Sequence, residues 1–177
     1  MMHMRKMVKG LILILLVLIF LPFIYEINFY NEVKVRKDFV KNMTTEKNDG
    51  FFFVYETVKY PSNVEIIKLE KKSNITLGMT TDPWNLNFGV IPIGIESRRF
   101  INLANRKEEI YKVEIQIYGN ISPMVDFDKN NFILRKDDEV KVTALLNSTL
   151  SKGTGKFMGE IDILSKRARM PFFNVIL

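Results

Sequence analysis

One short stretch of the chain has the spacing of a cation-binding loop. Asp126, Asp128 and Asn130 alternate along the sequence, and oxygen ligands at alternate positions can converge on one calcium ion. The pattern then departs from calcium loops, because Asn131 stands where the sharp turn needs glycine. We therefore favour a solvated loop here and keep these three residues as the candidate metal site.

Chemistry that needs cysteine or histidine is almost absent. The chain has no cysteine and one histidine, His3, which lies ahead of a long apolar run. Histidine-assisted nucleophiles and zinc sites of cysteine or histidine are therefore excluded from the remainder of the chain. Phosphate loops and dinucleotide fingerprints are missing too. The sequence thus predicts a protein that is not an enzyme and that binds no cofactor.

Four asparagines stand in the Asn-x-Ser/Thr pattern of N-glycosylation, namely Asn42, Asn74, Asn120 and Asn147. Asn120 is the poorest acceptor of the four, because Pro123 follows its serine. All four follow the apolar run, where they would be glycosylated if that side of the chain is outside the cell. Asparagine-rich turns are the alternative interpretation.

The apolar run Leu11–Tyr25 is uncharged and follows three cations. It is short for a spanning helix of about 20 residues and long for a signal-peptide core of about 7 to 15. Bulky residues follow it where signal peptidase requires small ones, so we favour a retained anchor at 11–30 over a cleaved signal. The preceding cations predict that residues 1–10 are cytoplasmic and that the C-terminal part is extracytoplasmic.

The charge of the chain does not indicate nucleic-acid binding. The net charge is +6 and the pI is about 9.4, but 26 basic residues are interspersed with 20 acidic ones. Nucleic-acid interfaces usually gather their cations into a patch or stripe. We therefore predict an ordinary solvated surface and no nucleic-acid partner.

The elements that would position these residues are strands. A polar stretch at 31–50, which we predict as a stalk ending in turns, precedes a region rich in aromatic and β-branched residues. Alternation of apolar and polar residues at 113–117 and 140–146 indicates sheets with one buried face. The predicted strands are 51–58, 64–69, 75–79, 86–91, 99–103, 111–118, 131–134, 139–146, 156–164 and 170–177.

The later strands carry a family resemblance. The strings DPWNLNFGVIPIG at 82–94, RRFINLAN at 98–105 and GKFMGEIDI at 155–163 resemble immunoglobulin-like domains of the ASPM/SPD-2/hydin and major-sperm-protein kind. This resemblance implies an all-β, immunoglobulin-like antiparallel β-sandwich at 82–177, behind a single N-terminal transmembrane helix and leading strands at 51–81. Similar domains occur in uncharacterised membrane-anchored archaeal surface proteins. In cytoplasmic relatives such domains bind proteins, so the resemblance implies a bias toward protein contacts.

These observations predict a non-enzymatic, membrane-anchored extracytoplasmic module that mediates protein–protein contacts in the cell envelope. Its expected partners are the lipid bilayer, through Leu11–Tyr25, and other envelope proteins. One alternative is a subunit or stator of an extracellular filament, since Lys9-Gly10 resembles the processing site of archaeal pilin-like precursors. A second alternative is a calcium-dependent binder that uses the Asp126 stretch.

Overall fold

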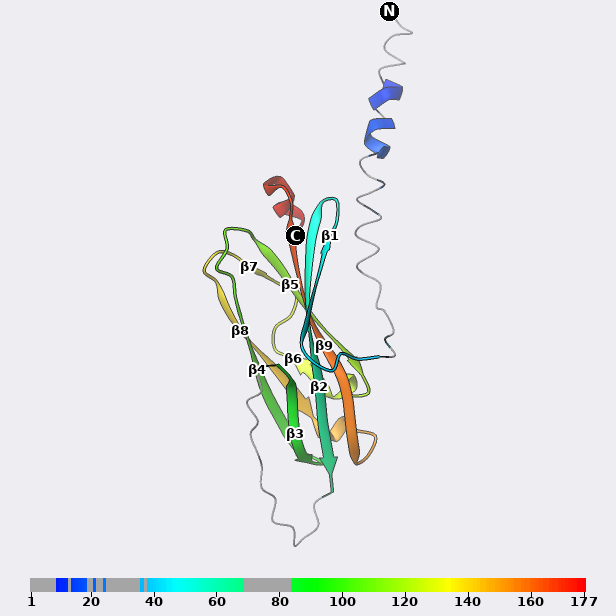
Figure 1. Ribbon diagram of the computed structural model, residues 1–177, viewed down its shortest axis with the longest axis vertical. Helices are drawn as coiled ribbons and strands as arrows, with labels where there is room; N and C mark the ends of the chain where they lie inside the picture. Colours follow the sequence, from blue (N-terminus) through cyan, green and yellow to red (C-terminus); the bar gives the residue numbers. More distant parts are fainter. Residues whose placement is uncertain are drawn as a thin grey trace, which may run out of the picture.

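The computed structural model describes residues 9–12, 14–18, 21, 24, 36, 38–68 and 84–177, and the strands among them form an all-β sandwich (Figure 1). The described positions of the apolar run are helical. Within the part of the chain that the structure describes, no helix is both long and apolar enough to cross a membrane. The other positions of the predicted anchor, His3, Asn74 and the predicted strand 75–79 lie outside the described residues.

Two sheets make up the described sandwich. The larger sheet has the order β1 (Thr44–Asp49), β2 (Phe53–Ile67), β9 (Gly155–Ala168), β5 (Tyr111–Gly119) and β7 (Phe132–Leu134), with β3 (Leu86–Pro92) also paired to β2. The smaller sheet has the order β4 (Glu96–Ala104), β8 (Glu139–Asn147) and β6 (Val125–Phe127). The β2–β3 pair is parallel and the other pairs are antiparallel. Short 3-10 helices are η1 (Ser122–Met124), η2 (Ser148–Leu150) and η3 (Pro171–Ile176).

The core lies between the sheets, as the alternation of apolar residues predicted. Val113 of β5 and Ile161 of β9 pack in one cluster with Ile101 of β4 and Val142 of β8. All four side chains are buried, and the strand neighbours of Ile101, Val113 and Val142 are more exposed. The predicted all-β class is therefore confirmed.

Strand β2 is longer than predicted. We expected two strands separated at Pro61, but a single strand runs through this proline. One edge of β2 pairs with β9, while the other pairs with β1 as far as Lys59 and with β3 from Ser62 onward. Pro61 lies where the second edge changes partner, and a residue without a backbone N–H is tolerated at such a gap.

Three other segments differ from the prediction. Residues 44–49, expected as turns at the end of a stalk, form β1, because a hairpin brings them alongside β2. Strand β6 was not predicted. Residues 170–177, expected as a strand, contain η3 instead. Pairing between β2 and β9 ends at Ala168, and Pro171 then occupies the first turn of η3, where its missing N–H is not needed.

Candidate functional site

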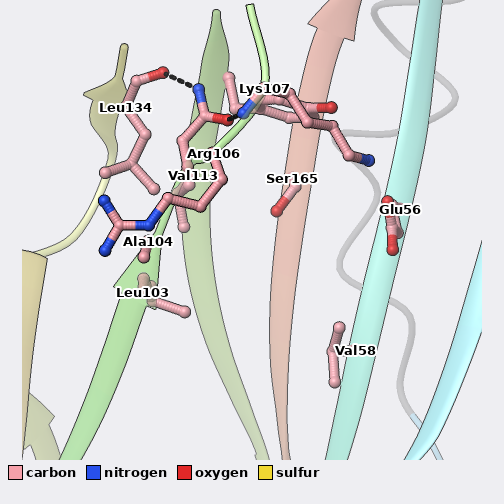
Figure 2. Close-up of a pocket in the computed structure, with 11 residues that line it drawn as sticks. Glu56, Val58, Leu103, Ala104, Arg106, Lys107, Val113, Leu134 and Ser165 are labelled. Carbon is pink, nitrogen blue, oxygen red and sulfur yellow. Dashed lines mark hydrogen bonds between the residues drawn. The ribbon is translucent and has the colours of Figure 1, made fainter. Parts of the chain in front are cut away.

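A groove opens between the sheets at the end of the sandwich that carries the β1–β2 hairpin. It has a volume of about 300 Å³ and is shown in Figure 2. Its apolar lining comes from four different strands, with Val58 on β2, Leu103 on β4, Val113 on β5 and Leu134 on β7. We call this hollow and its continuation, described next, the end groove.

The rim of the end groove is mainly basic. Arg106 and Lys107 come from the β4–β5 loop, and a second hollow of about 320 Å³ shares Lys107 and adds Lys47 and Arg167. Glu56 is the carboxylate that lines both hollows. No histidine or cysteine is among the lining residues that the structure describes. The arrangement therefore suits binding of an extended segment that carries acidic and apolar side chains.

Asn105 holds the β4–β5 loop in place beside the end groove. Its amide nitrogen donates to the carbonyl oxygens of Glu109 at 2.7 Å and Leu134 at 3.3 Å. Its side-chain oxygen accepts a hydrogen bond from the backbone N–H of Lys107 at 2.9 Å. The residue is buried, so these bonds satisfy a polar side chain that would otherwise be costly. Asn105 thus fixes the two rim cations that follow it.

A second polar site lies on the outer face of the larger sheet. Glu160 and Asp162 of β9 are both buried, and the guanidinium of Arg36 bridges their carboxylates. The Arg36–Asp162 distance is 2.7 Å, and the Arg36 guanidinium carbon lies 4.6 Å from the centroid of the Tyr118 ring. The backbone N–H of Val40 also donates to Glu160 at 2.8 Å. We call these side chains of Arg36, Glu160 and Asp162 the carboxylate clasp.

The environment of the clasp perturbs the ionisation of Asp162. Burial, with a smaller contribution from the neighbouring Glu160 carboxyl, raises the pKa of Asp162 to about 7, although Arg36 acts in the opposite direction. The Oδ1 atom of Asp162 is buried and accepts no hydrogen bond from the residues that the structure describes. One carboxyl of the pair therefore holds a proton up to near-neutral pH. Since Arg36 occupies the space between the acids, the clasp fastens the segment around residues 36–40 to β9.

The side chains of the candidate calcium residues Asp128 and Asn130 bond to different parts of the sandwich. Asp128 accepts a hydrogen bond from the backbone N–H of Thr143 on β8 at 2.6 Å, and this bond lowers the pKa of Asp128. Asn130 instead bonds the backbone of Ile115 on β5, accepting at 2.7 Å and donating at 2.8 Å. Asp126 lies exposed on β6. Within the described ranges, no group of three or more histidine, cysteine, aspartate or glutamate side chains is placed to hold a metal ion.

The candidate glycosylation residues lie on different parts of the sandwich. Asn42 is exposed just ahead of β1. Asn120 is also exposed, and its side-chain oxygen accepts from the N–H of Met158 at 2.6 Å. Asn147 caps η2 by accepting from the N–H of Thr149 at 3.0 Å. Whether sugars are attached to these asparagines stays a prediction.

Sequence reasoning did not find the end groove or the clasp. The alternation of β9 places Glu160 and Asp162 on the face opposite Ile161, which is the pattern of a solvated strand. Arg36, which covers them, precedes Glu160 by 124 positions, so no local pattern joins these residues. The one usable signal was Asn105, which lies two residues after the predicted strand 99–103 and is followed directly by two cations.

The comparisons with known proteins add no relative. No protein-family model, characterised protein or solved structure matches this chain. We therefore infer function from the geometry of the end groove and of the surfaces around it.

Proposed function

We propose that this chain is a non-enzymatic, membrane-anchored module on the outer side of the cell membrane that binds other envelope proteins. The observation that carries the proposal is the end groove, in which apolar side chains from four strands lie beneath a basic rim. Its cations outnumber its carboxylate, so it favours a partner segment with acidic residues beside an apolar one. The apolar run Leu11–Tyr25 supplies the anchor.

We also propose an immunoglobulin-like relationship for the sandwich. The constant-type immunoglobulin arrangement has strands A, B, E and D in one sheet and C, F and G in the other. The order β4–β8–β6 corresponds to B–E–D, and the pair β5–β9 corresponds to C–F. The chain departs from this arrangement at the place of strand G, which is filled by β2 from the N-terminal side.

A photo-crosslinking amino acid at Arg106, on the groove rim, tests the proposed function in membranes of the host. We expect a discrete adduct with another envelope protein, and we expect the double variant Lys107→Glu with Arg167→Glu to abolish it, because the rim then repels an acidic segment. The control position is Thr154, an exposed residue in the loop before β9. Equal adducts from both positions, or none from Arg106, would contradict the proposal.

Intact-mass measurement of the same material locates the mature N-terminus. Retention of the residues before Leu11 is the result expected for an anchor. A mature chain that begins at Leu11 would instead support the filament-subunit alternative.

A further inference from the structure

Large apolar side chains are exposed together at the end of the sandwich formed by the β1–β2 turn and η3. The exposed fractions are 71% for Phe51, 63% for Phe172, 93% for Val175 and 48% for Ile176. Phe51 lies in the turn after β1, and the other three belong to η3, which lies next to the β1–β2 hairpin in Figure 1. We call these four side chains the apolar tip.

The apolar tip rests on an ordered aromatic base. Phe52 is buried, and its ring contacts the rings of Phe51 at 4.8 Å and Phe173 at 5.0 Å between centroids. Phe172 in turn lies 4.1 Å from Phe173, and the N–H of Arg169 donates to the carbonyl of Phe52 at 2.9 Å. The turn and η3 are therefore held together, and a fixed apolar surface of this kind marks a contact site.

Basic residues lie on the elements that lead to the tip. Lys47 on β1 and Arg167 on β9 lie on the strands that lead to it, and Arg169 donates from Nε to the carbonyl of Gly50 in the turn at 2.7 Å. Asp49 is the neighbouring acid, 3.6 Å from Lys47 and 3.8 Å from Arg169. Exposed aromatic and aliphatic side chains with cations nearby match the boundary between anionic headgroups and acyl chains.

The predicted anchor can reach the same plane as the tip. The clasp fixes Arg36 to Asp162, and six strand residues, or about 20 Å, separate Asp162 from Ala168 near the tip. Residues 26–35 can span at most about 35 Å when extended. Their length therefore allows Tyr25, the end of the apolar run, to lie level with the tip.

We propose that the apolar tip inserts into the outer boundary of the bilayer that holds the anchor, so that the sandwich lies against the membrane. This inference rests on the membrane anchor of the proposed function. The occupant is the lipid surface itself, with Phe51 and the η3 side chains at the level of the acyl-chain boundary and the surrounding cations facing headgroup phosphates.

The absence of cysteine makes site-specific labelling a direct test. The full chain is placed in nanodiscs of phosphatidylcholine and phosphatidylglycerol, with a single cysteine at Val175 carrying an environment-sensitive fluorophore. We expect a blue-shifted emission and several-fold stronger quenching by nitroxide-labelled lipid than for the same label at Met158. Met158 is a matched control, since its side chain is 60% exposed and lies near the start of β9, at the opposite end of the sandwich (Figure 1).

The companion variant Phe51→Ser with Phe172→Ser should reduce the quenching of the Val175 label toward that of Met158. Equal quenching at both labels in a chain that has entered the nanodisc would overturn the tip insertion and leave the anchor intact. Failure of the chain to enter nanodiscs would overturn the anchor and the insertion together. A Val175 label that is shielded from lipid but self-quenches between copies would overturn the inference in favour of a second copy covering the tip.

Discussion

At the scale of single residues, the carboxylate clasp is the most unusual feature of the molecule. Two buried acids lie side by side on β9, where two negative charges would repel each other at low dielectric. Arg36 offsets one charge, and the raised pKa of Asp162 removes the other at moderately acidic pH. The clasp therefore destabilises the folded state most when Asp162 loses its proton.

The substitution Asp162→Asn should flatten the pH dependence of stability. The pKa of Asp162 is about 7 in the folded chain and near 3.9 in an unfolded one, so the folded state binds the extra proton between these values. Protonation of Asp162 therefore contributes in full to the free energy of unfolding below about pH 4. This contribution falls as the pH rises to about 7 and does not change further above that pH. We expect the free energy of unfolding of the wild type to fall by roughly 1–3 kcal/mol between about pH 5 and about pH 8. That of Asp162→Asn should stay constant over the same range.

Denaturant unfolding of the full chain in detergent at several pH values measures this effect. Asp126→Asn is the matched control. Because Asp126 is exposed, this substitution should leave the pH dependence of the free energy of unfolding unchanged. A decline that persists in Asp162→Asn would show that another group is responsible.

The clasp also marks the limit of prediction at this scale. The sequence correctly places Glu160 and Asp162 on the face of β9 that does not meet the second sheet. It cannot show that Arg36 covers them, because the contact depends on how the chain ahead of β1 crosses the larger sheet. The Asp126 stretch had a local motif, but tertiary hydrogen bonds to Thr143 and Ile115 hold two of its side chains on different sheets.

At the scale of elements, β5 and β9 approach closely where Gly119 faces Gly159. A Cβ atom added at Gly159 would collide with the carbonyl oxygen of Tyr118 and with the Ile121 side chain. The carbonyl belongs to the β5 backbone and cannot move without disturbing the ladder between the two strands. Glycine is therefore required at this point of β9 for close approach.

We expect Gly159→Ala to lower the free energy of unfolding by about 1–3 kcal/mol, which is the range of overpacked sites. The neighbouring exposed residue supplies the control, since Met158→Ala should change stability by less than about 0.5 kcal/mol. Chemical unfolding of the three proteins side by side measures the difference. If Gly159→Ala changed the free energy of unfolding as little as Met158→Ala, β5 and β9 could move apart at this point without a loss of stability, and the prediction would be wrong.

Elements with regular alternation could be predicted from the sequence, and the exceptions have physical causes. Strands β5 and β8 alternate cleanly and match their predicted ranges to within one residue. We predicted a break at Pro61, although the strand continues through it. Whether a proline interrupts a strand depends on which edge is unpaired at that position, and only the assembled sheet shows this. The polar strand β1 has no apolar face to reveal it, since all its residues are exposed.

At the scale of the whole molecule, β2 ties the N-terminal part of the chain to the sandwich. It pairs with β9 on one edge and with β1 and β3 on the other. Its side chains Val64 and Ile66 are buried in the same cluster as Phe88 of β3 and Leu146 of β8. Residues 51–81, which we placed ahead of the sandwich, thus contribute a strand to its core, because the resemblance began only at residue 82.

The proposed insertion of the apolar tip would also place the end groove close to the bilayer. The groove and the tip share the end of the molecule that carries the β1–β2 hairpin. We therefore expect the partner segment bound in the groove to be the membrane-proximal part of another anchored protein. The labelling experiment tests the tip separately from the groove, because Phe51, Phe172 and Val175 do not line the groove.

A chain that begins at residue 82 should fail to fold, although it contains the whole region of family resemblance. Without β2, one edge of β9 is unpaired and the cluster around Phe88 loses Val64 and Ile66. Each fully buried aliphatic side chain stabilises the fold by about 1.5–3 kcal/mol, and the other buried residues of β2 are lost as well. The total stability of a domain is only about 5–15 kcal/mol.

We expect residues 82–177 to lack cooperative unfolding and slow hydrogen exchange, and residues 36–177 to show both. Addition of a peptide of residues 53–67 should restore slow exchange in β9. A cooperative transition in residues 82–177 alone would contradict the structural role assigned to β2.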